Sequence, residues 1–207
     1  MGFPIDSSMK FIFSSSSLDD LVRLLKAWRF WVLGALIGAL IGAALYYIVP
    51  PPYRARAVVN VDFNLEQAWP KDTDRQQFYY LEREARKMVE IAWSDDVLSQ
   101  VNAPVEELRA GKLTLSQPAE AGWHFFADDK NPQKAEELAS AWANAFVEKA
   151  QAEIVSGNIN EFVELEVTQS ANLPKKRSVS LSNYLITGVI GFLFLAVFFV
   201  LFIKPKD

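Results

Sequence analysis

Two long blocks without a charged residue constrain this chain more than any other feature. Phe30 to Val49 spans 20 residues and Leu185 to Ile203 spans 19, and neither block contains Asp, Glu, Lys or Arg. At about 1.5 Å per helical residue, each block is long enough to cross a hydrocarbon core of about 30 Å. The first block also exceeds the apolar region of a cleaved signal peptide, which has about 7 to 15 residues. We therefore predict two transmembrane helices.

The distribution of basic residues predicts the orientation of these helices. Four basic residues precede the first block, namely Lys10, Arg23, Lys26 and Arg29. Only Arg54 and Arg56 follow it closely, and the first helix usually sets the orientation because positive residues stay in the cytoplasm. Lys175, Lys176 and Arg177 precede the second block, but long loops translocate largely regardless of their charge. We predict that both termini are cytoplasmic.

This topology divides the chain into five predicted segments. They are a cytoplasmic segment 1–29 with an amphipathic helix from Leu18 to Arg29, a first span 30–49, an extracytoplasmic domain 50–184, a second span 185–203 and a cytoplasmic tail 204–207. The domain carries 15 Lys and Arg against 21 Asp and Glu, and so has a net charge of −6. An acidic surface does not suit the phosphates of nucleic acid, so no nucleic-acid partner is expected.

Hydrophobic periodicity in residues 50–184 predicts an α+β domain with a small mixed or antiparallel sheet. A strand with one buried face is predicted at 53–63, where Ala55, Ala57, Val59 and Val61 alternate with Arg54, Arg56, Val58, Asn60 and Asp62. Further strands are predicted at 112–116, 122–127 and 162–169, and residues 117–121 join the first two as a hairpin.

Helices are predicted between these strands. The first runs from Asp74 to Trp93 and has the apolar stripe Phe78, Leu81, Ala85, Met88, Val89 and Ala92. We interpret its carboxylates as a solvated charged face. Shorter helical pieces are predicted at 95–101 and 104–111. The last helix has Asn131 as its N-cap and Pro132 at its first position, with the apolar stripe Ala135, Leu138, Ala139, Trp142, Ala145, Phe146 and Ala150.

Few residues of the chain could carry catalytic or metal chemistry. His124 is the only histidine and there is no cysteine. Asp128 and Asp129 lie close to it in sequence, but a metal site needs three or four converging ligands. There is no phosphate-binding G-x-x-x-x-G-K-[ST] loop and no nucleophile motif. We predict no enzyme activity, no metal site and no cofactor, and we place His124 on a strand whose other face carries Trp123 and Phe125.

Five pieces of the sequence, taken in order, carry a resemblance to a known family. They are "LDDLVRLLKAWRFW" before the first span, "YRARAVVNV" after it, "WSDDVLSQV", "ADDKNPQKAEELASAWANAFVEKA", and "ANLP" before the second span, which contains Ala171 and Pro174. Together they resemble the chain-length determinants, or polysaccharide co-polymerases, of bacterial surface-polysaccharide export. The resemblance runs nearly end to end.

Two departures from the family pattern stand out. The family usually repeats Pro at three-residue intervals before the second span, but Arg177 and Ser180 hold those places here, so only Pro174 carries the motif over. Classical members also insert a long helical hairpin before the last strand, where this chain has only residues 151–161. The chain therefore resembles the base domain of the family without its hairpin.

The resemblance implies a non-enzymatic role in the bacterial cytoplasmic (inner) membrane. Family members form homo-oligomers that organise a polysaccharide polymerase or exporter and bias the length of the product, which is an O-antigen, a capsule or an exopolysaccharide. Membrane lipid is the other expected partner.

Two alternative functions remain. Short relatives act as adaptors that activate a separate tyrosine kinase; with only "KPKD" after Ile203, the N-terminal segment would have to contact that kinase. The second alternative is an extracytoplasmic sensor or binding module, in which Trp123, Phe125, Trp142 and Phe146 would line a pocket. At strand and helix spacings these aromatic residues are more typical of a core.

A stripe of small residues in the first block predicts close helix packing. In "GALIGALIG", Gly34, Gly38 and Gly42 recur at every fourth position, and such faces let a second helix approach closely. Two partners fit the stripe: this chain's own second block, where Thr187, Gly188 and Gly191 form a small patch, or the same helix of a neighbouring copy. We predict that the stripe supports the packing of a homo-oligomer.

Overall fold

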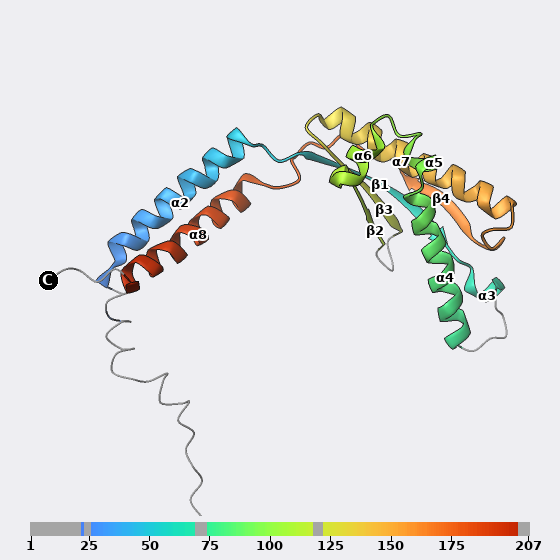
Figure 1. The fold of residues 1–207 in the computed structure, drawn as a ribbon, viewed down its shortest axis with the longest axis horizontal. Helices are drawn as coiled ribbons and strands as arrows, with labels where there is room; N and C mark the ends of the chain where they lie inside the picture. Colours follow the sequence, from blue (N-terminus) through green and yellow to red (C-terminus); the bar gives the residue numbers. More distant parts are fainter. Residues whose placement is uncertain (1–21, 23–25, 69–73, 118–121, 203–207) are drawn as a thin grey trace, which may run out of the picture. The chain divides into compact units, whose positions relative to one another are not determined.

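The computed structural model describes residues 22, 26–68, 74–117 and 122–202. They form two compact units, divided between Pro50 and Pro51 and again between Ser178 and Val179 (Figure 1). Of the amphipathic helix predicted from Leu18 to Arg29, only residues 22 and 26–29 are described, and the predicted tail 204–207 lies outside the described residues.

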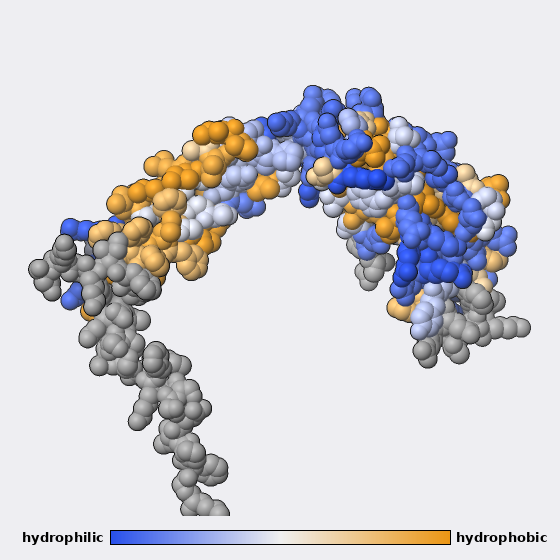
Figure 2. Space-filling view, in the orientation of Figure 1, coloured by the Kyte–Doolittle hydropathy of each residue, from blue (hydrophilic) through white to orange (hydrophobic). Residues whose placement is uncertain are grey.

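The first unit is a pair of apolar helices, α2 (Trp28–Ile48) and α8 (Leu181–Phe202). Both are long and apolar enough to span a membrane, as the sequence predicted. Helix α8 begins four residues before the predicted block, because the side chain of Ser180 accepts a hydrogen bond from the N–H of Asn183 (3.3 Å) and so starts the helix earlier. Hydrophobic residues cover most of the visible surface of both helices (Figure 2).

The second unit, Pro51–Ser178, is built on a four-stranded sheet in the order β2-β3-β1-β4. The strands are β1 (Tyr53–Asp62), β2 (Leu113–Ser116), β3 (Trp123–Asp129) and β4 (Glu164–Gln169). All three pairings are antiparallel. This confirms the α+β class, the predicted strands and the antiparallel pairing of β2 with β3. Of the predicted connection between these two strands, residues 117–121, only residue 117 is described.

The central strand β1 buries the face that its alternation predicted. Ala55, Ala57 and Val59 are buried on this face, while Arg54 and Arg56 on the opposite face are exposed. Val58 departs from the alternation, since it is also buried. The reason is the backbone of Gly122, which adopts a positive φ of 74° and passes so close that a Cβ there would lie 3.1 Å from Cγ1 of Val58.

Helix α7 (Pro132–Val155) covers the buried face of the sheet (Figure 1). It begins as predicted, because Oδ1 of Asn131 accepts hydrogen bonds from the N–H groups of Gln133 (2.9 Å) and Lys134 (3.3 Å). All seven residues of its predicted apolar stripe are buried: Ala135, Leu138, Ala139, Trp142, Ala145, Phe146 and Ala150. The predicted packing role of this helix is confirmed.

Shorter elements complete the second unit. They are α3 (Leu65–Ala68), α4 (Asp74–Ala92), α5 (Asp95–Leu98), α6 (Val105–Glu107) and the π-type turn η2 (Leu108–Lys112). The predicted helix at 74–93 is confirmed, but its predicted apolar stripe is partly wrong. Met88 and Ala92 of this stripe are buried as predicted. Phe78 is 61% exposed, and Tyr80 and Glu84, which lie outside the predicted stripe, are buried instead.

A buried carboxylate explains this difference in α4. Glu84 is fully buried, so the prediction of a solvated charged face is wrong at this position. Its oxygens accept hydrogen bonds from Lys87 Nζ (3.1 Å), Arg83 Nε (2.9 Å) and the N–H of Asn160 (3.4 Å). Lys87 also donates to the carbonyl oxygen of Asn158 (2.7 Å). Because these partners satisfy the charge, the polar side chain can be buried, and it anchors α4 to the segment after α7.

Candidate functional site

The predicted glycine stripe lies where α2 and α8 contact each other, and three of the glycines bring the two backbones together. A Cβ at Gly38 would overlap the carbonyl group of Gly188 and lie 2.7 Å from its carbon. A Cβ at Gly42 would lie 2.9 Å from the carbonyl carbon of Tyr184. We call Gly38, Gly42 and Gly188 the glycine interface. No larger residue fits there without moving a helix backbone.

The other two predicted glycines lie outside this interface. A Cβ at Gly34 would lie 3.4 Å from the Cβ of Ala196, which is ordinary contact, so the helices are already further apart at this level. A Cβ at Gly191 would meet no atom within 4 Å. The structure thus brings Gly34, Gly38, Gly42 and Gly188 to the contact between the helices, and leaves Gly191 beside it.

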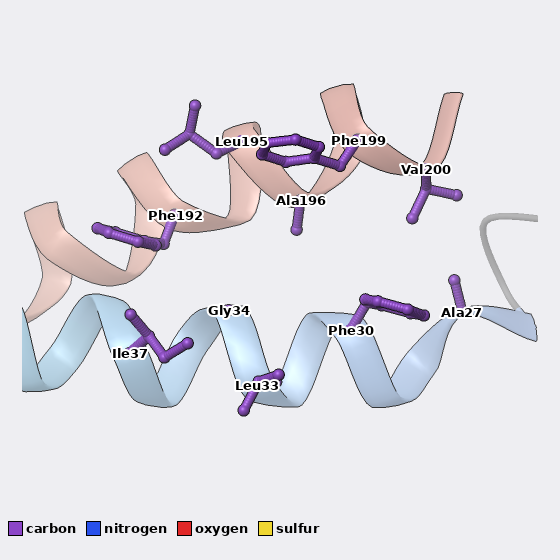
Figure 3. Close-up of a pocket in the computed structure, with 10 residues that line it drawn as sticks. All are labelled: Ala27, Phe30, Leu33, Gly34, Ile37, Phe192, Leu195, Ala196, Phe199 and Val200. Carbon is purple, nitrogen blue, oxygen red and sulfur yellow. The ribbon is translucent and has the colours of Figure 1, made fainter. Parts of the chain in front are cut away.

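An apolar groove continues from the glycine interface toward the start of α2. It has a volume of about 570 Å³ and lies between α2 and α8. Figure 3 shows four side chains pointing into the space between the helices: those of Ala27, directly before α2, of Phe30 on α2, and of Ala196 and Val200 on α8. Every residue that lines the groove is apolar.

In the second unit, the first and last segments of the domain are held together by polar contacts. Prolines 50–52 have no N–H to donate, but the carbonyl oxygens of two of them are satisfied. Pro51 O accepts a hydrogen bond from Nη1 of Arg177 (2.8 Å), and Pro52 O accepts one from the N–H of Ser178 (2.8 Å). The guanidinium of Arg177 also lies over the ring of Tyr53, 4.9 Å from its centroid. The chain therefore enters and leaves this domain by neighbouring segments.

The residues of the predicted motif "ANLP" differ in their environment. Ala171 is buried, and its N–H donates a hydrogen bond to Oγ of Ser140 on α7 (3.2 Å). Pro174 is partly exposed. Arg177, three residues further on, makes the contacts with Pro51 and Tyr53. Arg177 thus has a structural role at the end of this domain.

The aromatic residues of the sensor alternative form the core of the domain. Trp123, Phe125, Trp142 and Phe146 are buried, and their rings pack on one another, with Phe125 and Trp142 centroids 4.8 Å apart. Nε1 of Trp142 donates a hydrogen bond to the carbonyl oxygen of Ala92 (2.7 Å). These side chains pack the core of the domain.

The acidic residues near His124 also have structural partners. Both oxygens of Asp128 accept hydrogen bonds from Arg54 (2.8 and 2.6 Å), which raise the pKa of the guanidinium. Oδ1 of Asp129 accepts one from the N–H of Asn131 (2.9 Å). His124 is partly exposed and lies on the opposite face of β3 from the buried Trp123 and Phe125, as predicted. Among the described residues no group of three His, Asp or Glu side chains converges as metal ligands would.

Comparisons of the sequence with models of protein families and with curated proteins find no match.

The contact between α2 and α8 can be tested by a designed disulfide, because the chain has no native cysteine. A Cβ at Gly34 lies 3.4 Å from that of Ala196, near the separation of about 3.5 to 4.5 Å in disulfides. We expect Gly34→Cys/Ala196→Cys to form an intramolecular disulfide, detected as a mobility shift of the monomer on a non-reducing gel.

Two further changes in this double-cysteine protein test the glycine interface. Gly38→Leu should abolish the disulfide, because the added side chain pushes the backbones apart. Gly191→Leu is the matched control and should leave it intact, since the space at Gly191 is open. A disulfide that survives Gly38→Leu, or that joins two chains instead of one, would contradict this packing.

The role of Arg177 can be tested by hydrogen exchange. Removing its side chain deletes a charge-assisted hydrogen bond of about 1.5 to 3 kcal/mol, and Arg177 is only partly buried. We therefore expect Arg177→Ala to increase amide exchange at Tyr53 and Ser178 by roughly tenfold. Lys176→Ala, an exposed neighbour, should have no such effect. Equal exchange in both variants would show that Arg177 does not hold the segments together.

Proposed function

We propose that the protein is a non-enzymatic membrane scaffold of bacterial surface-polysaccharide biosynthesis. In this proposal α2 and α8 cross the cytoplasmic membrane, both termini are cytoplasmic, and Pro51–Ser178 lies on the outer side. Copies assemble into a homo-oligomer that organises a polymerase or exporter and biases the length of the polysaccharide.

The observation that carries the proposal is an α+β domain inserted between two paired apolar helices. The helices contact each other through the glycine interface. This contact supports α2 as a permanent partner of α8 and not as a signal peptide that is cleaved off. The domain is entered and left by neighbouring segments, joined through Arg177. This order of parts is the one implied by the resemblance to the chain-length determinants.

The polar side chains of the domain are compatible with a structural role. The buried Glu84 is paired with Lys87 and Arg83, and Asp128 is paired with Arg54. The scaffold proposal assigns no chemistry to them. Orientation with the start of α2 in the cytoplasm is supported by Lys26 and Arg29, because basic residues favour that side.

The proposal predicts that loss of the protein changes the length distribution of a surface polysaccharide. We expect deletion of the gene to broaden or shift the polysaccharide ladder on a gel, and the wild-type gene to restore it. Gly38→Leu should fail to restore it, because it separates α2 from α8, whereas Ala44→Leu, at an exposed position of α2, should restore it.

Other results would favour a different function. An unchanged ladder in the deletion strain would contradict the scaffold. The adaptor would be indicated if, in the deletion strain, a co-encoded kinase lost its tyrosine phosphorylation and the polysaccharide were absent instead of altered in length. Saturable binding of an oligosaccharide to a monomeric protein would indicate the sensor.

A further inference from the structure

The apolar groove between α2 and α8 is open on the surface of the helix pair. Phe30 is 63% exposed and Phe199 is 55% exposed, although both line the groove. Figure 3 shows small side chains, Ala27 and Ala196, pointing into the space between the two helices. The groove is therefore a site for an elongated apolar occupant rather than an enclosed cavity.

The groove exists because side-chain size changes along the helix pair. At the glycine interface the backbones touch, so no space remains. From Gly34 toward the start of α2, side chains hold the two helices apart. The side chain of Ala196 is too small to fill the gap between them. In a membrane this space cannot stay empty without losing dispersion contacts, so a lipid chain or a protein helix must occupy it.

Positive charge marks one end of the groove. Lys26 and Arg29 are exposed and flank Ala27, which lines the groove. Trp28, with 59% of its surface exposed, lies between them and has the guanidinium of Arg29 over its ring, 5.9 Å from the centroid. Trp is typical of the headgroup level of a bilayer. The sequence has no acidic residue between Asp20 and Asp62, so none in this stretch of α2 neutralises these cations.

We propose that the groove binds an acyl chain of an anionic phospholipid, whose headgroup is held by Lys26 and Arg29. The inference rests on the membrane placement in the proposed function. Basic residues next to a groove between spans suit an anionic headgroup. A second copy of α2 is a poorer occupant, because all copies have the same orientation in a membrane. Their Lys26 and Arg29 side chains would meet at the same depth and repel one another.

The test is native mass spectrometry of the full-length protein released from nanodiscs. The discs contain equal amounts of phosphatidylglycerol and phosphatidylcholine with identical acyl chains. We expect the wild-type protein to retain one phosphatidylglycerol in preference to phosphatidylcholine. Lys26→Gln/Arg29→Gln should weaken this preference roughly thirtyfold, as expected for two cations near a membrane surface. Lys175→Gln/Lys176→Gln, two exposed cations elsewhere in the chain, should leave it unchanged.

A second pair of variants tests the groove itself. Ala196→Leu fills the groove and should remove the retained lipid. Ala44→Leu adds the same side chain at an exposed position of α2 that does not line the groove, and should keep it. Equal retention in Ala196→Leu and Ala44→Leu, or equal retention of both lipids by the wild type, would overturn the proposal.

Two other outcomes separate this inference from the proposed function. Release of oligomers without lipid, which Ala196→Leu but not Ala44→Leu converts to monomers, would show that a second copy occupies the groove; this overturns the lipid inference but not the scaffold. Failure of the protein to enter nanodiscs, together with its extraction from cell membranes by alkaline carbonate, would overturn the membrane placement and the lipid site together.

Discussion

Close contact between two helix backbones at Gly38, Gly42 and Gly188 is the constraint on which the apolar unit depends. In the proposed membrane placement, hydrocarbon surrounds apolar side chains as favourably as another helix does, so α2 and α8 would associate through shape and dispersion contact. The glycine interface supplies that shape, since neither backbone is held away by a side chain. It also fixes the register of the pair, with Ala196 opposite Gly34 and the ring of Tyr184 against that of Tyr46. The groove opens where the side chains no longer permit backbone contact.

The domain Pro51–Ser178 depends on a different principle, the satisfaction of polar groups. Its core is formed by α7 and the sheet, but its attachments use hydrogen bonds. Glu84 and Lys87 hold α4 to the segment after α7. Leaving the buried carboxylate of Glu84 without its hydrogen-bond donors would cost more than one hydrogen bond itself contributes. Arg177 donates a hydrogen bond to the carbonyl oxygen of Pro51, in a stretch of prolines that have no N–H of their own. Arg177 thereby joins the two ends of the domain that lead to α2 and α8.

The sequence predicts local structure well where one physical rule dominates. The cap at Asn131, the stripe of α7, the alternation of β1 and the two apolar helices all follow from spacing and composition. Prediction from the sequence fails where the burial or contact of a residue depends on a partner that is distant in the sequence. Glu84 looks like a surface carboxylate until the N–H of Asn160 and Lys87 are placed beside it. Glycine spacing predicts a contact face, but it cannot tell that Gly188 meets Gly38 while Gly191 lies in open space. Nothing in the sequence indicates that Arg177 donates a hydrogen bond to the carbonyl oxygen of Pro51, which lies 126 residues earlier.

The scaffold and the lipid site share one requirement, that α2 and α8 cross a bilayer with the domain on its outer side. The absence of native cysteine allows this to be measured by labelling single introduced thiols in intact spheroplasts. Ser99, exposed in the domain, and Lys26, exposed before α2, are suitable positions. The account predicts that a membrane-impermeant maleimide labels Ser99→Cys without lysis and labels Lys26→Cys only after lysis. Labelling of Lys26→Cys in intact spheroplasts, or protection of Ser99→Cys, would contradict it.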